Sequence, residues 1–278
     1  MSEAISEQQF EAIKRAVHQA SLPLLALVPD ISKGGKSDVK CAVGTGVMIE
    51  IEDRLFLLTA RHVVEAYPAN TLWFPPSPGA NLETFGTVST FYDQTHPNRD
   101  TVVVELHETG LADKIRSAGY WKILTIENIV APKSYDRSGT RLLSGYPSEL
   151  GYENQVGFAQ TPLVLSTKVL EPDPTPSSIS VPCPDTDMFF VFDNQLEDTA
   201  TSEIVVPPKL QGMSGCGIWL LLPRTGTDFW EPWQSLYLIG TQRSVLPRHW
   251  IRGVSWRAIA DILQSNDVGL SNGEAVPT

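Results

Sequence analysis

Three short stretches of the sequence carry residue types that together can do nucleophilic chemistry. Ser214 lies in the glycine-flanked run QGMSGCGIW, His62 ends the apolar run LLTARH, and Asp100 directly precedes the apolar run TVVVEL. A serine hydroxyl becomes a useful nucleophile when a neighbouring base takes its proton, and histidine suits that task because its pKa lies near neutrality. A carboxylate can hold the imidazole in the required tautomer. We therefore expect Ser214 as nucleophile, His62 as general base and Asp100 as the orienting group.

Each of these signals also has an ordinary structural explanation when it is taken alone. A histidine after a strand is commonly structural, an aspartate is common where strands begin, and a glycine-rich turn needs no function. The chain order His, Asp, Ser is one of three in which this triad is built, so the combination favours catalysis. The remaining candidates, His96, His107 and Asp93, are poorer, because neither histidine follows a Thr-Ala strand end and no apolar strand follows the aspartate.

The elements that must position these residues are mostly short strands. Residues 7–20 and 255–263 have helical spacing of apolar residues, and the runs between them are short, β-like and separated by turn signals. Residues 49–56 predict a hairpin with a charged tip, and the polar run at 131–139 is the best candidate for a linker. Two sets of about six strands predict an all-β fold of two six-stranded antiparallel β-barrels with a helix near each end.

The expected organisation has three parts. An N-terminal helical extension precedes two barrels, each of which contributes part of the triad. The expected boundaries are 1–23 for the extension, 24–135 for the first barrel with His62 and Asp100, and 136–278 for the second barrel with Ser214 and the closing helix.

The motifs resemble those of the trypsin-like (chymotrypsin-fold) serine peptidases. LLTARHVV resembles the family's histidine motif, RDTVVVEL its aspartate motif and GMSGCG its nucleophile motif. GTGVMIE, LYLIGTQRS and VSWRAIADIL resemble the strand that enters the histidine hairpin, the substrate-pocket strand and the closing helix. The resemblance implies chymotrypsin-like barrels and a serine endopeptidase that hydrolyses peptide bonds through an acyl-enzyme, with no cofactor and no metal.

The same resemblance implies two further parts of the site. The backbone N–H groups of Gly212 and Ser214 would form the oxyanion hole. A substrate pocket would lie nearby. Its expected lining residues are Pro208, Lys209, Arg243 and Ser244.

Several positions depart from the family pattern. Met213 stands where members activated by cleavage carry an aspartate that pairs with the new N-terminus, so we do not expect that activation here. Pro208, followed by Lys209, replaces the aspartate that selects basic side chains, so nothing predicts cleavage after Arg or Lys. Two interpretations of Arg243 remain open: it receives an acidic side chain of the substrate, or it is a solvated surface residue. We expect Cys216 to pack in the core.

Composition indicates which classes of partner and which cellular compartment to expect. A net charge of −11 argues against a nucleic-acid binder, and no apolar run is long enough for a membrane span. Three cysteines and a polar N-terminus predict a cytoplasmic protein without a signal peptide, on the intracellular, HtrA-like side of the family but without a PDZ domain. The expected partner is a protein or peptide substrate, with a regulatory protein partner left open.

Two other functions remain as alternatives. One is a catalytically silent trypsin-like fold that acts as a binding or regulatory module, although the triad is intact in letters. The other is an esterase, which the His, Asp, Ser order and the lack of a nucleophile elbow disfavour. The proline-rich segment 171–187 predicts an exposed loop that either gates the cleft, binds a regulator or only connects strands.

Overall fold

We examined a computed structural model of the chain. It describes residues 6–29, 38–129, 140–154, 157–170, 183, 185–193, 195–197, 203–222, 231–247 and 249–268. The expected linker at 131–139 lies outside these ranges, as does most of the proline-rich segment at 171–187.

A capped amphipathic helix, α1 (Glu7–Gln19), opens the described chain as predicted. Ser6 caps it by accepting a hydrogen bond from the Gln9 backbone N–H, and the Gln9 side chain accepts one from the Ser6 backbone in return. One face buries Ile13, Ala16 and Val17. The helix is therefore part of the folded body rather than a free extension.

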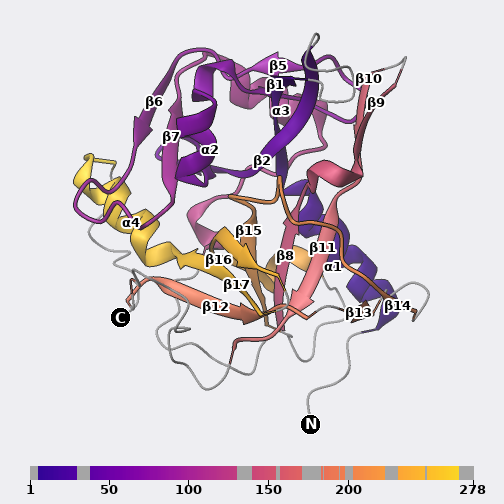
Figure 1. The fold of residues 1–278 in the computed structure, drawn as a ribbon. Coiled ribbons are helices and arrows are strands. Elements are labelled where there is room, and N and C mark those ends of the chain that lie inside the picture. Colours follow the sequence, from indigo (N-terminus) through magenta and orange to yellow (C-terminus); the bar gives the residue numbers. More distant parts are fainter. Residues whose placement is uncertain are drawn as a thin grey trace.

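The first sheet has seven antiparallel strands in the order β5-β4-β1-β2-β3-β7-β6 (Figure 1). Its β2–β3 connection is a two-residue hairpin with Glu52 and Asp53 at positive φ, as the charged tip predicted. The strands are β1 (Leu22–Pro29), β2 (Asp38–Ile51), β3 (Arg54–Thr59), β4 (Trp73–Phe74), β5 (Glu83–Thr84), β6 (Val88–Phe91) and β7 (Val102–Leu106). The helices of this half are α2 (Arg61–Ala66), η2 (Ala69–Thr71), α3 (Leu111–Ala118) and η3 (Ile126–Asn128).

The second sheet has six antiparallel strands in the order β11-β8-β15-β16-β17-β12. Its two edges meet, because Leu170 N–H donates to Phe189 O and Val191 N–H donates to Lys168 O. The strands are β8 (Thr140–Gly145), β11 (Leu163–Thr167), β12 (Asp187–Val191), β15 (Gly217–Leu221), β16 (Leu236–Leu246) and β17 (Trp250–Ser255). Other elements are η4 (Ser148–Leu150), the pairs β9 (Gly151–Asn154) with β10 (Gly157–Gln160) and β13 (Leu196–Glu197) with β14 (Ile204–Val205), η5 (Pro232–Gln234) and α4 (Trp256–Ser265).

The expected all-β architecture of two curled antiparallel sheets with a helix near each end is confirmed (Figure 1). The first sheet has seven strands instead of six because residues 83–92, which the sequence predicts as one β-like run, form two strands, β5 of only two residues and β6. Periodicity cannot indicate strands that short. The proposed boundaries at residues 23 and 135 remain predictions.

One apolar cluster joins both sheets and both terminal helices. It contains Phe56 and Val103 of the first sheet together with Trp219 of the second, and Ile13 of α1 and Ile259 of α4 pack into it. Cys216 is fully buried in a separate cluster within the second sheet, so its expected core position is confirmed. The two sheets therefore meet through shared apolar packing.

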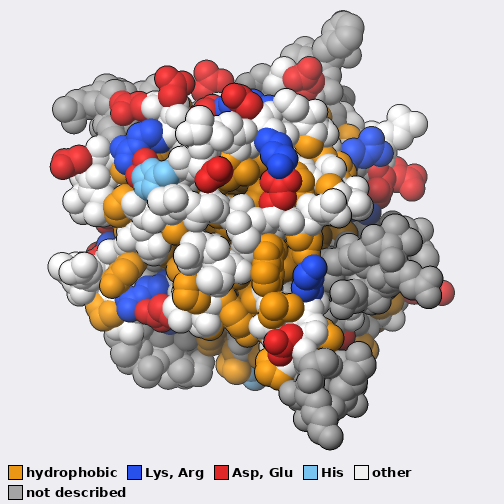
Figure 2. All heavy atoms as spheres, turned by 90° about the horizontal axis from the view of Figure 1, so that it is seen from above, with side chains coloured by type: hydrophobic (Ala, Val, Ile, Leu, Met, Phe, Trp, Pro, Cys, Tyr) orange, Lys and Arg blue, Asp and Glu red, His pale blue; other side chains and the backbone are white. Residues whose placement is uncertain are grey.

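The surface carries both signs of charge. Figure 2 shows acidic and basic side chains interspersed over the face seen from above, with hydrophobic side chains exposed between them. Within the described ranges, no helix has the length and apolar content needed to cross a membrane.

Candidate active site

His62 and Asp100 are brought together by the pairing of two strands. β3 and β7 are antiparallel neighbours, with Thr59 opposite Val102, so the chain leaving β3 and the chain entering β7 lie side by side. His62 follows in the first turn of α2, and Asp100 immediately precedes Thr101 and the strand. The pairing of β3 with β7 thus brings together two residues that are far apart in the sequence.

The Asp100 carboxylate holds His62 at two points. Oδ2 lies 2.7 Å from the imidazole Nδ1, and Oδ1 accepts a 2.9 Å hydrogen bond from the His62 backbone N–H. Because an ionised carboxylate only accepts hydrogen bonds, Nδ1 carries the proton and Nε2 keeps the lone pair of the neutral ring. This arrangement therefore leaves Nε2 as the atom of His62 that can accept a proton.

The environment of His62 changes its basicity. The hydrogen bond with Asp100 raises the pKa of His62 above 6.5, and burial acts in the opposite direction. The charges of Asp100 and Glu65 raise this pKa further, whereas the charge of Arg243 lowers it. The imidazole side chain is 48% exposed, so a substrate can reach it.

The loop that carries Asp100 is fastened by its own polar side chains. Asp93 accepts hydrogen bonds from the backbone N–H groups of Thr95 and His96, and its carboxylate also pairs with the His96 ring. Burial alone would raise the pKa of Asp93, but the hydrogen bond from the Thr95 hydroxyl, together with those from the two backbone N–H groups and the His96 ring, outweighs it and lowers the pKa to about 2. Arg99 then connects Asp93 to Asp261 of α4, at 2.9 and 3.1 Å. Asp93 and His96 therefore have a structural role in this loop.

Ser214 reaches the same place from the second sheet. It lies in the turn before β15, between Gly212 at φ 93° and Gly215 at φ 87°, where most side chains would be strained. A Cβ on Gly215 would lie 2.2 Å from Thr59 Oγ1 and 2.5 Å from the backbone N of Ala60. The turn that carries Ser214 is thus packed directly against the end of β3 and Ala60, two residues before His62.

Backbone hydrogen bonds fix this turn between the sheets. Ser214 O accepts a 2.9 Å bond from Thr45 N–H of β2, and Gly215 N–H donates a 2.8 Å bond to Gln242 O of β16. A Cβ on Gly44 would contact both Val63 of α2 and Ser214 O, at 2.8 and 3.3 Å. The Ser214 side chain is half-buried, and among the described residues its hydroxyl has no hydrogen-bond partner. The structure joins His62 to Asp100 directly, whereas it brings Ser214 toward them only through the packing of its turn, and no hydrogen bond joins Ser214 to His62, both of which are described.

The backbone around the expected oxyanion hole is held in one orientation. Gln211 O accepts a 2.7 Å hydrogen bond from Ser148 N–H. The N–H and C=O of a trans peptide point in opposite directions, so the Gly212 N–H points away from Ser148. Within the described chain, the N–H groups of Gly212 and Ser214 make no hydrogen bond. The N–H groups of Gly212 and Ser214, which are predicted to form the oxyanion hole, are therefore unpaired within the described chain.

The four expected pocket residues fall into different surroundings. Pro208 and Ser244 are half-buried. Lys209 is exposed and faces Glu149, which accepts a 2.9 Å bond from its backbone N–H. Arg243 is only 16% exposed and lies near two carboxylates. The assignment of these four residues to a substrate pocket remains a prediction.

Sequence reasoning missed the residue that ties these segments together, Thr45. Its hydroxyl donates a 2.9 Å hydrogen bond to Gly212 O and accepts a 3.0 Å bond from Tyr146 N–H. The signal was the GTG triplet, because a Cβ on Gly46 would lie 2.4 Å from a side-chain atom of Leu57, and a Cβ on Gly44 would lie 2.8 Å from one of Val63. Glycines on both sides let this part of β2 approach its neighbours closely.

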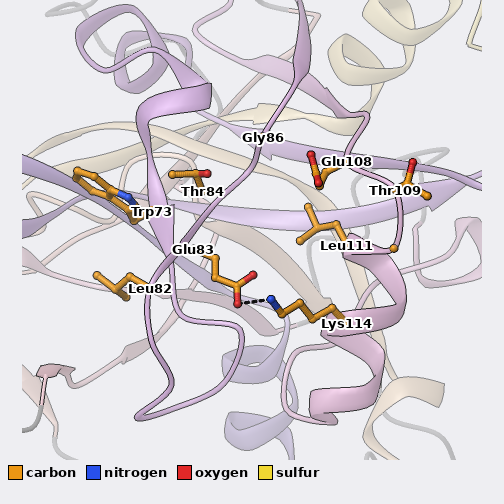
Figure 3. A pocket seen from close by; sticks show the side chains of 10 residues that line it. Trp73, Leu82, Glu83, Thr84, Gly86, Glu108, Thr109, Leu111 and Lys114 are labelled. Carbon is orange, nitrogen blue, oxygen red and sulfur yellow. Dashed lines mark ion pairs between the residues drawn. The ribbon is translucent and has the colours of Figure 1, made fainter.

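A pocket of about 560 Å³ lies elsewhere, between the β4–β5 segment and the start of α3. Leu82 and Leu111 line it, and Figure 3 shows Glu83 and Lys114 joined by an ion pair at its side. None of its lining residues belongs to the triad or to the expected substrate pocket. In the described part of the chain, no group of three or more His, Cys, Asp or Glu residues is placed to hold a metal ion.

Comparison with known proteins yields no family for this chain. It matches no protein-family model and no curated protein. A functional assignment therefore depends on the arrangement of His62, Asp100 and Ser214.

Proposed function

We propose that this protein is a trypsin-like serine endopeptidase. One observation carries the proposal. The imidazole of His62 lies 2.7 Å from the Asp100 carboxylate, and the turn that carries Ser214 packs against the chain just before His62. An imidazole with a fixed tautomer next to a serine in a tight turn is the arrangement that activates a hydroxyl for acyl transfer. Free Cys41, Cys183 and Cys216 support a reducing compartment such as the cytoplasm as part of this proposal.

In the proposed reaction, Ser214 Oγ attacks the carbonyl carbon of the scissile peptide bond while His62 Nε2 takes the hydroxyl proton. Asp100 stabilises the imidazolium that forms. The negative charge on the carbonyl oxygen is stabilised by hydrogen bonds that the N–H groups of Gly212 and Ser214 donate, and one such donor is worth about 2.7–4 kcal/mol. His62 then gives its proton to the leaving amine, and an acyl-enzyme remains. Water then attacks the acyl-enzyme with His62 again as the base, and the carboxylic acid product leaves as Ser214 regains its proton.

The test is active-site labelling with a fluorophosphonate probe, combined with digestion of unfolded casein. The wild-type protein is expected to react with the probe and to cleave casein, whereas Ser214→Ala is expected to lose both without losing stability. Ser117→Ala, which removes an exposed hydroxyl on α3, is the matched control.

The outcomes separate the proposal from its alternatives. Labelling that persists in Ser214→Ala would remove Ser214 as the nucleophile. A wild-type protein that is folded but neither labelled nor active would favour the silent binding module. Cleavage of small esters without cleavage of casein would favour an esterase.

A further inference from the structure

A buried guanidinium lies beside the carboxylate that orients His62. Arg243 of β16 is 16% exposed, and its Nε lies 4.0 Å from Oδ2 of Asp100. This is the oxygen that pairs with His62 Nδ1 at 2.7 Å. Histidine and arginine therefore approach the same carboxylate oxygen.

The backbone explains why Arg243 points toward the site. Opposite β17, Gln242 pairs with Gly253 and Ser244 pairs with Arg252, so Arg243 is the extra residue of a β-bulge. A bulge leaves one residue unpaired and turns its side chain away from the regular alternation. Arg243 is thus aimed by a local irregularity of the strand.

The other side of Arg243 faces a carboxylate that already has a partner. Asp187 is 2% exposed, and its oxygens accept hydrogen bonds of 2.9 and 2.5 Å from Nε and Nη2 of Arg252. Arg243 Nη1 lies farther from it, at 4.0 Å from Oδ1. Because Arg252 occupies Asp187 at close range, the charge of Arg243 is only partly compensated there and acts on Asp100 as well.

We propose that Arg243 is a positioning residue of the triad, which shares Oδ2 of Asp100 with the His62 ring, holds that carboxylate in place and opposes protonation of the imidazole. This inference rests on the proposed function, since it assigns a role within the same site. A less basic imidazole is neutral, and so ready to act as a base, over a wider pH range. It is also a stronger acid when it returns the proton to the leaving amine.

The charges around both residues agree with this role. The pKa of His62 is raised by its hydrogen bond with Asp100 and lowered by burial, and among the charges of Asp100, Glu65 and Arg243 only that of Arg243 lowers it. Burial lowers the pKa of Arg243, as does the charge of Arg252, whereas Asp100, Asp187 and Cys183 raise it. A guanidinium remains charged at any working pH, so its effect on His62 is permanent.

The experiment compares Arg243→Gln and Arg243→Met with Arg243→Lys, which keeps the charge. The pKa of His62 is measured by NMR of ring-labelled histidine, and the fluorophosphonate labelling rate is followed against pH. Both neutral variants are expected to raise the His62 pKa by about 0.5–1 unit. Their labelling rate should fall by about 3–10-fold below that pKa and approach the wild-type rate at higher pH. The Lys variant keeps the positive charge, so its His62 pKa should stay closer to the wild-type value than that of either neutral variant.

Arg116→Gln on α3, which makes the same change in net charge, is the matched control, because its ion pairs are with Glu50 and Asp113. An unchanged His62 pKa in folded neutral variants would overturn the proposal. So would failure of both neutral variants to fold while Arg243→Lys folds, since Arg243 would then be structural. A raised His62 pKa together with labelling that is independent of Ser214 would support this inference and refute the peptidase proposal separately.

Discussion

The hydroxyl of Thr45 allows the attachment of the nucleophile turn to be tested by a nearly isosteric change. Thr45→Val replaces the hydroxyl with a methyl group and leaves Gly212 O without this donor and Tyr146 N–H without this acceptor. Thr45 is completely buried, so water cannot easily replace the lost partners.

The magnitude follows from these two hydrogen bonds. A buried polar group that loses its partner costs about 1–3 kcal/mol, and the newly buried methyl group recovers part of that cost. We expect a loss of about 2–4 kcal/mol in the free energy of unfolding, which lowers the melting temperature by roughly 4–10 °C in a protein of this size. Because Gly212 precedes Ser214, the proposed nucleophile, by two residues, labelling should slow by about 10–100-fold through misplacement of the turn.

The assay pairs thermal unfolding with the fluorophosphonate labelling rate. Thr45→Ser retains the hydroxyl and should stay within about 1 kcal/mol of wild type. Thr71→Val, which removes an exposed hydroxyl bonded to Pro68 O, controls for the loss of a threonine hydroxyl in general. Equal stability of the Val and Ser variants would refute the role of these bonds. A destabilised Val variant that labels at the wild-type rate would refute their link to the nucleophile.

Two further predictions concern the turn and the loop around the triad. Gly215→Ala places a Cβ 2.2 Å from a side-chain oxygen at φ 87°, so we expect a loss of about 3 kcal/mol or more and an unlabelled protein, measured by urea unfolding and labelling. The lowered pKa of Asp93 means that its ionised form stabilises the fold above pH 3.8 and that this contribution disappears as pH falls to about 2. Asp93→Asn should therefore be less stable by about 1–2 kcal/mol near neutral pH, a value reduced for solvent screening, and the difference should narrow in acid.

Each of these has its own control. Gly79→Ala also changes a glycine at positive φ, but its Cβ would meet nothing within 4 Å, so a comparable loss there would show that backbone strain alone explains the Gly215 result. The control for Asp93→Asn is Asp113→Asn, which removes a largely exposed carboxylate on α3. A pH-independent gap between Asp93→Asn and wild type would contradict the assigned pKa.

The features that the sequence predicted well are those encoded by neighbouring residues. The strand end before His62, the aspartate before an apolar strand and the capped helix at α1 are each contained in a few consecutive letters, so local chemistry identifies them. The two-residue hairpin between β2 and β3 is of the same kind.

The features that were missed depend on distant partners. Thr45 contacts Tyr146 and Gly212, which lie 101 and 167 positions along the chain, and no local pattern specifies such pairs. Arg243 could be placed on the right strand, but its direction depends on a bulge that only the β16–β17 register shows. Separations of this size are closed by the tertiary fold, where packing overrides local preference.

The ion pairs of Arg99 have a consequence for the order in which the site is made. Arg99 fastens the loop of Asp100 to Asp261, in the last described helix, and α4 also fills the cluster between the sheets. A chain emerging from the ribosome acquires its N-terminal sheet first. It can therefore expose His62 and Asp100 well before Ser214 and α4 have been synthesised. The proposed peptidase would gain its activity only after the second sheet and α4 have been synthesised, so that chains without them would be harmless to the nascent proteins around them.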